Sequence, residues 1–470
     1  MNKSIPHQVS ETSYNRSDCD IGVIHLGYGA FHRAHQAVFL DNYMELTGDL
    51  SFGIAAVNLR ESEADDFAMN DLAQNGYLLK SVAPSGETTL TRVRSHVLFS
   101  DWTVDREGTE NLLARASVNL VTITVTESGY YTDPIGNLDR SDPTIASEVN
   151  GDVGKSIYAF LAKALDARRT QLGAPITVCC CDNIRKNGKM LESNFTSYLE
   201  ATGCEELKDW VCSHVTFPCS MVDRITPRPT SELVDELSAL TGKAVAQPIM
   251  AEAFLQWVLE DKFSSKMPDL SQVGVTVTKD VDPFEETKIR VLNGGHTCLA
   301  YLAALRGIEA FDQAMATPDL FDHFWHFETR EVLPALKIDL PFSKAAYLDK
   351  IADRFKNEAI GDTVARICSD GMAKFPIFIR PTLADCLAQG VMPSFGIKSI
   401  ASWHTFAKHV AAGRISFEYI EPSWSQLKNL LGTENFILSK QLWGDLPKEY
   451  PEFSKALRAE IREMDRSWPV

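Results

Sequence analysis

IGVIHLGYGAFHRAHQAVFLDNYMELTG, residues 21–48, combines three patterns in succession. A short apolar run typical of a buried strand leads into two closely spaced glycines, and apolar residues at helical spacing follow as far as Gly48. The next run, FGIAAVNLR at 52–60, again has the composition of a buried strand. A strand, a glycine turn, a helix and a second strand form a β-α-β unit, which predicts the start of a doubly wound parallel sheet.

Strand and helix patterns continue to alternate as far as about residue 230. VNLVTITVT at 118–126 and PITVCCC at 175–181 are short β-branched runs, and residues 154–173 between them have helical spacing. Such alternation is typical of an α/β domain with a parallel sheet.

The pattern changes in the second half of the chain. Segments 231–242 and 251–263 are predicted to be helices, and VGVTVTKDV at 273–281 one last strand. From Pro283 onward nearly every segment has helical character. We therefore predict an α/β domain over residues 1–281 and a mainly α-helical domain over residues 282–470, with a ligand site in the cleft between them.

Composition excludes several classes of protein. The chain has 470 residues and a formal net charge of −17, which argues against nucleic acid or an anionic membrane surface as a partner. No apolar stretch approaches the roughly 18 to 20 residues of a membrane span, and the N-terminus lacks the apolar core of a signal peptide. We expect a cytoplasmic protein that binds no membrane.

The ten cysteines show no paired spacing. Cys179, Cys180 and Cys181 are consecutive within an apolar run, which predicts reduced thiols on a buried strand. The sequence contains neither a CxxC pair nor an HExxH motif, so no metal site is predicted.

Gly27 and Gly29 stand where a dinucleotide would bind in a Rossmann-type domain. Glycines between a strand and a helix let backbone N–H groups approach a pyrophosphate, although glycine turns also occur for steric reasons alone. His32 occupies the third position of the usual GxGxxG fingerprint. His32, Arg33 and His35 stand close together beside this turn, which favours a role facing an anion. The alternative is that they form the solvated start of a helix.

The second predicted strand ends at Arg60 and Glu61. Glu61 suits the ribose hydroxyls of NAD, whereas Arg60 could accept the extra phosphate of NADP or stack on adenine. Glu61 favours NAD and leaves NADP open. The predicted cofactor-binding residues are Gly27, Gly29, Phe31, His32, Arg60 and Glu61.

A second polar cluster opens the apolar helix predicted to begin at Asp282 and Pro283, which suit the N-cap and first position. At about 100° per residue, four polar side chains share one sector of this helix. They are Glu285, Lys288, Asn293 and His296. Gly294 and Gly295 are expected to leave room for a ligand beside that sector.

Lys288 is a candidate proton acceptor. The positive end of the helix and burial would both disfavour its ammonium form, as a base near neutral pH requires. From these residues alone, the alternative is a surface pair of Glu285 with Lys288 and a histidine satisfied in the core.

Six motifs, in order between about residues 21 and 390, resemble those of the mannitol dehydrogenase family, the polyol-specific long-chain dehydrogenases. They are GYGAFHRAHQA (27–37), TVTESGY (124–130), CDNIRKNG (181–188), MVDRITP (221–227), QWVLEDKF (256–263) and K-x4-N-x2-H (288–296). The resemblance implies a metal-independent, NAD(P)-dependent enzyme with an N-terminal Rossmann-type domain and a helical substrate-binding domain. It implies oxidation of a secondary alcohol of a sugar alcohol, or reduction of the matching ketose or keto-uronate.

The resemblance also implies roles for single residues. Lys288 corresponds to the catalytic lysine, and Asn183 and Asn293 to the two amides that hold the reacting oxygen. Two amide donors aimed at an oxygen that gains charge would act as an oxyanion hole.

Four further residues correspond to positions around the substrate. His296 matches a ligand of a substrate hydroxyl, and Asp223 and Arg366 match contacts to the substrate chain. Glu285 matches the acidic residue linked to exit of the proton from the lysine.

The substrate remains open between two branches of the family. CDNIRKNG and VTFPCSMVDRITP (215–227) are similar to the uronate branch, but Ser128 stands where that branch tends to have lysine. DTVAR (362–366) and FIRPTL (378–383) are more similar to the polyol branch. We favour a mannitol, arabinitol or sorbitol type of polyol, with fructuronate or tagaturonate reduction as the alternative. A non-catalytic NAD-sensing protein is a remote alternative, because the lysine and amides are intact. We expect a monomer.

Overall fold

The structure is a computed structural model, which describes residues 9–63, 75–133, 135–415, 419–432 and 434–468. The chain divides into two compact units. The first, here called the sheet unit, comprises Met1–Ala83 and Glu87–Asp282. The second, here called the helical unit, comprises Pro84–Gly86 and Pro283–Val470.

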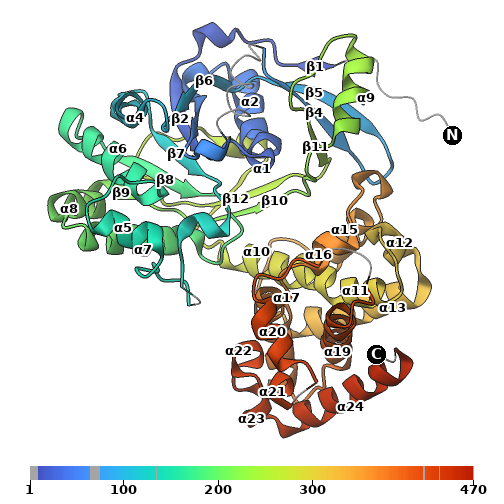
Figure 1. Ribbon diagram of the computed structural model, residues 1–470. Coiled ribbons are helices and arrows are strands. Elements are labelled where there is room, and N and C mark those ends of the chain that lie inside the picture. Colours follow the sequence, from blue (N-terminus) through green and yellow to red (C-terminus); the bar gives the residue numbers. More distant parts are fainter. Residues whose placement is uncertain (1–8, 64–74, 134, 416–418, 433, 469–470) are drawn as a thin grey trace. The chain divides into compact units, whose positions relative to one another are not determined.

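A six-stranded parallel sheet forms the centre of the sheet unit (Figure 1). Its strands are β2 (Ile21–Leu26), β3 (Gly53–Asn58), β6 (His96–Asp101), β7 (Leu120–Ile123), β8 (Ile176–Cys180) and β9 (Val215–Thr216). The order β6-β3-β2-β7-β8-β9 is the order 3-2-1-4-5-6 of dinucleotide-binding folds. The predicted doubly wound sheet is therefore confirmed, and its topological switch point lies between β2 and β7.

Helices cover both faces of this sheet, which explains why its strands are apolar runs and not alternating ones. Val23 of β2 packs in one cluster with Phe39 and Leu40, whereas the next residue, Ile24, packs in another cluster with Phe160. The helices of the unit are α1 (Ala30–Ala34), α2 (Gln36–Thr47), α4 (Arg106–Glu110), α5 (Pro143–Val149), α6 (Ile157–Gln171), α7 (Asn187–Ala201), α8 (Glu205–His214) and α9 (Ser231–Thr241).

The consecutive cysteines follow the same alternation. Cys180 points into the cluster of Phe160, and its neighbours Cys179 and Cys181 point into that of Phe39. All three are buried, free thiols. This agrees with the predicted buried strand.

Two smaller sheets complete the unit. One has the order β1-β5-β4-β11 and the other β10-β12-β13. Their strands are β1 (Ser10–Glu11), β4 (Tyr77–Val82), β5 (Thr88–Val93), β10 (Ser220–Asp223), β11 (Ile249–Glu252), β12 (Gln256–Glu260) and β13 (Thr276–Thr278). The strand predicted within 273–281 is confirmed as β13. Strands β4, β5 and β6 lie in a segment to which the sequence patterns assigned no element.

The helix predicted over 251–263 is wrong, because this segment contains the end of β11 and all of β12. β12 is the central strand of its sheet, antiparallel to β10 and parallel to β13. Trp257, Val258 and Leu259 are all buried. A strand buried on both faces shows no alternation, so its pattern cannot be told from that of a buried helix.

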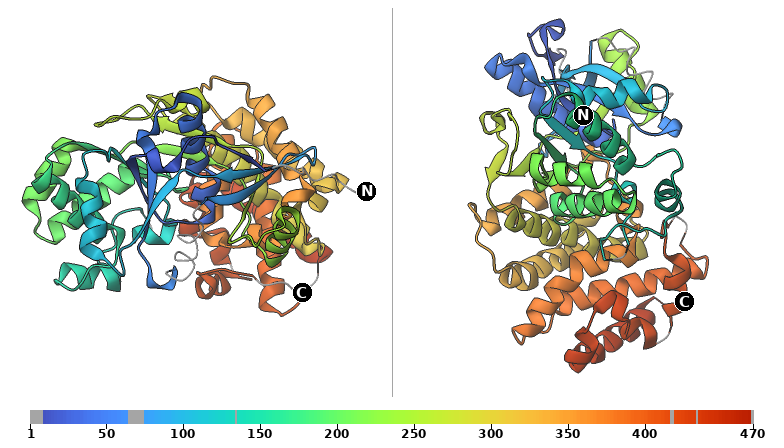
Figure 2. Two further views of the ribbon diagram at one scale, coloured as in Figure 1. Left: turned by 90° about the horizontal axis from the view of Figure 1, so that it is seen from above. Right: turned by 90° about the vertical axis from the view of Figure 1, so that its left-hand side faces the viewer.

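The helical unit contains no strand among its described residues from Pro283 onward, and both views of Figure 2 show helices and connecting loops there. Its first helices are α10 (Asp282–Thr287), η7 (Lys288–Asn293), α11 (Gly294–Leu305), α12 (Phe311–Ala316), α13 (Pro318–Phe327), η8 (Glu328–Val332), α14 (Leu333–Ala335) and α15 (Lys344–Phe355). The later ones are α16 (Val364–Cys368), α17 (Gly371–Lys374), η10 (Phe375–Ile379), α18 (Arg380–Ala388), α19 (Ser394–Ala411), α20 (Trp424–Leu430), α21 (Glu434–Ile437), α22 (Lys440–Trp443), α23 (Leu446–Glu449) and α24 (Pro451–Ser467).

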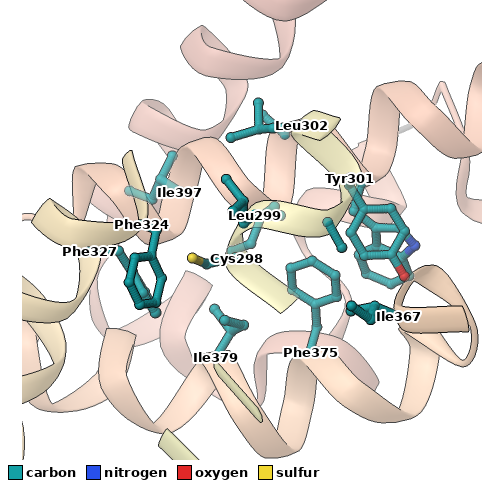
Figure 3. Packing of buried hydrophobic residues seen from close by; sticks show 14 of the residues in the cluster. Cys298, Leu299, Tyr301, Leu302, Phe324, Phe327, Ile367, Phe375, Ile379 and Ile397 are labelled. Carbon is teal, nitrogen blue, oxygen red and sulfur yellow. The ribbon is translucent and has the colours of Figure 1, made fainter. Parts of the chain in front are cut away.

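Helix α11 lies at the centre of this unit, and all of its residues are buried. Figure 3 shows Cys298 directed toward Phe324 and Phe327 of α13, with Phe375 of η10 on the side of Tyr301. The rings of Tyr301 and Phe375 are 5.7 Å apart between centroids. A helix enclosed on all sides is apolar all round, as residues 298–305 are.

Three segments of the helical unit, η7, η8 and η10, are π-helical. Each interrupts a longer helical run, and η7 lies against both of the others. The helix predicted from Asp282 is thus present over its full length, but Lys288–Asn293 form a π turn and not an α turn. Such turns occur mostly as single bulges and often at functional sites. Among the described residues, no helix is long and apolar enough to cross a membrane.

Candidate functional site

The glycine turn after β2 is tightly determined. Gly27 has a φ of +94°, and a Cβ there would lie 2.0 Å from the carbonyl oxygen of Thr124. The Gly27 carbonyl accepts hydrogen bonds from the Gly29 N–H at 2.8 Å, the Thr124 hydroxyl at 3.0 Å and His25 Nε2 at 2.8 Å. At Gly29, no atom of the described chain beyond its immediate neighbours lies within 4 Å of a Cβ position. The turn is therefore closed behind Gly27 and open in front of Gly29.

Three buried histidines support the turn from inside. The rings of His25 and His32 are stacked with centroids 3.2 Å apart, and His32 Nε2 is 2.9 Å from His96 Nε2. Burial lowers the pKa of all three, that of His25 to about 3, so the cluster is neutral. The other nitrogen of His32 faces Gln36 at 3.3 Å. Both nitrogens of His32 thus have partners within the protein, and a direct contact to a cofactor remains a prediction.

The alternative of a solvated helix start is wrong. His32, Arg33 and His35 are all buried. Arg33 donates to the carbonyl of Gln247 at 2.5 Å, and His35 Nε2 lies 2.8 Å from the carbonyl of Gln256. These polar groups hold the first helix against neighbouring segments of the sheet unit.

Arg60 and Glu61 lie beyond the carboxyl end of β3, as predicted. The Arg60 guanidinium donates to the carbonyl of Val125, beyond the end of β7, at 3.2 Å. Glu61 is exposed at the start of a short 3-10 helix, Glu61–Glu63. Phe31 is half-buried, with its ring stacked on His35 at 4.9 Å.

These residues fit a dinucleotide. The positive φ of Gly27 and the open space at Gly29 allow a phosphate to approach the backbone closely. The exposed carboxylate of Glu61 follows β3, the second strand of this sheet along the chain. Both features lie at the carboxyl edge of the parallel sheet, and the glycine turn, which follows β2, lies beside its switch point.

The ends of β7 and β8 carry the next group of polar residues. Asn183 is exposed and follows Asp182, whose carboxylate accepts the N–H groups of Val125 at 2.8 Å and Thr126 at 3.2 Å. The hydroxyl of Tyr130 donates to the same carboxylate at 2.6 Å. Asn183 thus follows a residue that joins two strand ends.

Asp223 is the last residue of β10, and its exposed fraction is 4%. It pairs in register with Gln256 of β12. The sheet unit therefore holds Asn183, Asp223 and all the predicted cofactor residues.

In the helical unit, the π turn η7 carries the predicted catalytic lysine and amide. Lys288 begins this turn with an exposed fraction of 7%, and the half-buried Asn293 ends it. At about 100° per residue, an α-helix would place Asn293 about 140° from Lys288, at the far edge of the predicted sector, whereas in a π turn residues i and i+5 are about one turn apart. The π geometry brings the two side chains onto the same face more closely than a regular helix allows.

Arg290 anchors the π turn from its other side. Its guanidinium donates twice to Asp385 at 2.7 Å and once to the hydroxyl of Thr382 at 3.1 Å, both on α18. The exposed fraction of Arg290 is 4%. A buried charge held by a carboxylate fixes the rotation of the helix about its axis.

The expectation that Gly294 and Gly295 make space for a ligand is wrong. A Cβ at Gly294 would lie 3.2 Å from the carbonyl oxygen of Phe378. At Gly295 it would lie 2.8 Å from the ring of Phe324 and 3.0 Å from a carboxyl oxygen of Glu328. The space beside these glycines is filled by η10, α13 and η8, so the glycines permit close packing of helices.

His296 lies one turn further along. Its ring stacks on Phe355 with centroids 3.9 Å apart, and Nε2 is 4.0 Å from Asp362. Burial lowers the pKa of His296 to about 3, which keeps the imidazole neutral. Burial would raise the pKa of Asp362, but Arg366, which donates to both of its oxygens at 2.6 and 2.5 Å, holds it below the usual value.

Predicted residues of this unit therefore lie close together: Glu285 (buried), Lys288, Asn293, His296 and, through Asp362, Arg366. Sequence reasoning missed Asp182, Asp362 and Lys374. Lys374 has its pKa lowered by burial, donates to the Ile367 carbonyl at 2.9 Å and is one of the cations that depress the pKa of His296. Asp182 and Asp362 had a signal, because they stand in the motifs CDNIRKNG and DTVAR beside the predicted Asn183 and Arg366.

No group of three or more His, Cys, Asp or Glu side chains suited to a metal ion occurs among the residues that the structure describes.

Comparison with known proteins places both units. Residues 21–272 match the Mannitol dehydrogenase Rossmann domain, and residues 280–464 match the Mannitol dehydrogenase C-terminal domain. The chain is 35% identical to D-arabinitol 4-dehydrogenase of Klebsiella pneumoniae over 400 residues, which is 84% of this chain and 86% of that protein. It is 33% identical to mannitol 2-dehydrogenase of Cereibacter sphaeroides, over 97% of each chain.

A solved structure, the ternary complex of Pseudomonas fluorescens mannitol 2-dehydrogenase with NAD and D-mannitol, is similar to the whole chain. The TM-score is 0.87 at 30% identity, covering 97% of this chain and 94% of that one. The chain therefore belongs to the mannitol dehydrogenase family of oxidoreductases.

Proposed function

We propose that this protein is an NAD-dependent, metal-independent polyol dehydrogenase that uses Lys288 as its general acid and base. The observation that carries the proposal is the π turn η7, which places the buried Lys288 and Asn293 one turn apart on the same helix. Burial favours the neutral amine that proton acceptance requires.

The substrate class rests on the relatives. Two that cover most of the chain are named for arabinitol and mannitol, and the similar solved complex contains D-mannitol. This favours a polyol over the hexuronate alternative.

Bound NAD would supply the acceptor for the hydride of the carbinol carbon. The glycine turn at Gly27 and Gly29 would hold its pyrophosphate, and Glu61 its adenosine ribose. A 2′-phosphate in place of that ribose hydroxyl would meet a carboxylate, so we infer a preference for NAD over NADP.

The chain's own residues provide the rest of the chemistry. Lys288 accepts the proton of the carbinol hydroxyl during oxidation and returns it during reduction. The Asn293 amide donates to that oxygen as it gains negative charge, and Asn183 is proposed as the second donor. Neutral His296 binds a further hydroxyl of the substrate. Lys288 and the amides thus supply what a zinc ion would supply in a metal-dependent alcohol dehydrogenase.

We also propose the division of labour between the domains. Residues 1–281 would bind the dinucleotide and residues 282–470 the substrate. The division of the chain at Asp282 and Pro283, and the separate family matches on either side, support this proposal.

The test is a comparison of the parent enzyme with Lys288→Ala. Parent activity should appear with NADH and ketoses such as fructose or xylulose, and polyol oxidation should rise with pH as Lys288 loses its proton. Lys288→Ala should lose most activity in both directions while still binding NADH. Small primary amines are expected to restore part of the rate.

Two outcomes would contradict the proposal. Near-parental kcat with an unchanged pH profile in the variant would show that another group moves the proton. Reduction of fructuronate or tagaturonate in preference to every ketose would move the protein to the uronate branch.

A further inference from the structure

We propose that Asp182 is a positioning residue for polyol oxidation: its carboxylate ties the ends of β7 and β8 together and so fixes the backbone that carries Asn183. This inference rests on the proposed function of Asn183. It concerns a residue that touches neither substrate nor cofactor in the mechanism described above.

The carboxylate of Asp182 receives three donors from one segment, residues 125–130. One oxygen accepts both the Val125 N–H at 2.8 Å and the Tyr130 hydroxyl at 2.6 Å, and the other accepts the Thr126 N–H at 3.2 Å. Thr126 has a φ of +65°, a conformation that a β-branched residue rarely adopts. Such strain persists only where the surroundings impose it, and two of the three donors are the N–H groups at this bend.

The backbone of Asp182 is held as well. Its carbonyl accepts the Ile184 N–H at 2.8 Å and the side-chain amide of Asn187 at 3.0 Å. The Asn187 amide also donates to the carbonyl of Ser220, at the start of β10, at 2.9 Å. Asn183 therefore follows a residue whose side chain is held by the segment beyond β7 and whose carbonyl is linked through Asn187 to β10.

The anchor requires a charged carboxylate, because three donors point at its two oxygens. Protonation would place a hydrogen on one of these oxygens and break at least one bond. Burial raises the pKa of Asp182 to about 6, even though the hydrogen bonds from Tyr130 and Val125 lower it. The other ionisable groups facing it are Glu127 from the same bend, whose charge raises this pKa, and the neutral thiols of Cys180 and Cys181. Arg60 approaches the bend through the carbonyl of Val125.

The pH dependence of ketose reduction distinguishes the titration of Asp182 from that of Lys288. Reduction needs protonated Lys288, so the lysine gives no reason for kcat to fall at low pH. We expect kcat for NADH-dependent reduction in the parent enzyme to fall below about pH 6, where Asp182 takes up a proton. Asp182→Asn should lower kcat about 10- to 100-fold, the effect of a misplaced catalytic group, and should remove this acid limb.

Tyr130→Phe is the milder variant. It removes one of the three donors and leaves the carboxylate in place, so the pKa of Asp182 should rise and the acid limb should move to higher pH. This variant tests the inference even where Asp182→Asn folds poorly. NADH affinity should change little in both, because neither residue belongs to the glycine turn.

Asp41 offers a matched control. It is buried on α2, its pKa is also raised to about 6 by burial, and it accepts a tyrosine hydroxyl, that of Tyr14, at 2.5 Å. Asp41→Asn is expected to lower thermal stability but to retain the acid limb of the parent. If folded Asp41→Asn enzyme lacks the acid limb, the limb reflects destabilisation of the whole protein at low pH, and the inference is overturned.

The inference can fail while the proposed function stands. Parental kcat and an unmoved acid limb in both Asp182→Asn and Tyr130→Phe, together with a large loss in Asn183→Ala, would show that Asn183 needs no such anchor. Parental kcat in Asn183→Ala would instead refute the assigned role of Asn183, and with it the reason for positioning it.

Discussion

Two carboxyl groups whose pKa is raised by burial, one in each unit, are held in opposite ways. Asp182, at the strand ends of the sheet unit, receives three donors, and burial raises its pKa only to about 6. Glu328, on the π turn η8 of the helical unit, is fully buried, and neither oxygen has a hydrogen-bond partner among the described residues. Burial raises its pKa well above the usual value, opposed only by the charge of Arg290.

This difference extends to the polar residues around each group. At the strand ends of the sheet unit, hydrogen bonds hold the polar residues in place, as at Gly27 and Asp182. In the helical unit, close packing acts beside the bonds of Arg290 to α18, since Gly294 and Gly295 admit helices η10, α13 and η8 at close range. Loss of a hydrogen bond should therefore be the sensitive change in the first region, and added volume the sensitive change in the second.

The largest effect is expected at Asn293, which belongs to the packed region but acts through a hydrogen bond. Asn293→Ala should lower kcat about 10²- to 10³-fold while NADH affinity changes little, because the donor matters when charge develops on the oxygen. Steady-state kinetics with NADH binding by fluorescence would measure both. Asn183→Ala should behave alike; normal kcat in both variants would remove the amides from the mechanism.

Gly295→Ala tests the packing of the π turn. The new methyl group would lie 2.8 Å from the ring of Phe324, and the free energy of unfolding should fall by about 1 to 3 kcal/mol. Gly29→Ala is the contrasting control: its φ is −83° and the space around it is open, so stability should hold while the KM for NADH rises. Equal loss of stability in both variants would remove the contrast between the two regions.

Glu328→Gln tests whether the unpaired carboxyl is protonated. Because its folded pKa is raised, the folded state holds a proton that the unfolded state releases, and stability should fall as pH rises above the usual pKa of glutamate. The slope is about 1.4 kcal/mol per pH unit until the folded pKa is reached. Urea denaturation of Glu328→Gln from pH 5 to 9 should lack this contribution, and identical pH dependence in parent and variant would show that Glu328 finds a partner.

The smallest effect is expected at Glu61, which is exposed and neither packed nor part of a bonded network of the kind around Asp182. The parent should prefer NADH to NADPH, and Glu61→Ala should narrow that preference by about fivefold in kcat/KM, the size of a solvent-screened charge interaction. Equal use of both cofactors by the parent would indicate that Arg60 dominates at this strand end.

Local patterns predicted much of the fold because helices on both faces of the sheet require the parallel strands to be apolar on both sides. The runs at 21–26 and 175–181 are apolar except for His25 and Thr177, and both form inner strands of the sheet. The same rule misled the prediction at 251–263, because Trp257 and its neighbours are buried on both faces in a sheet of different connectivity. Which elements flank a strand is a long-range property that its own residues do not contain.

The sequence proposes the residues of the candidate site, but it does not contain their geometry. Lys288, Asn293 and His296 were found through their spacing and a family resemblance, but an ideal helical wheel assumed an α turn where η7 is π-helical. The two glycines were assigned to the ligand because nothing nearby in sequence indicates that Phe324 and Phe378 approach them. The role inferred for Asp182 depends on donors more than 50 residues away in the chain.

The π turn at Lys288–Asn293 bears on how motif spacings are interpreted. A π bulge can be regarded as an α-helix that carries one inserted residue. A lysine and an asparagine separated by four residues are out of phase in a regular helix, and a separation of three or two would align them. The separation of four residues between Lys288 and Asn293 is thus the spacing that one inserted residue produces. Deleting one residue from this segment would restore α-helical hydrogen bonding and, in doing so, shift everything after it by one position against the rest of the core.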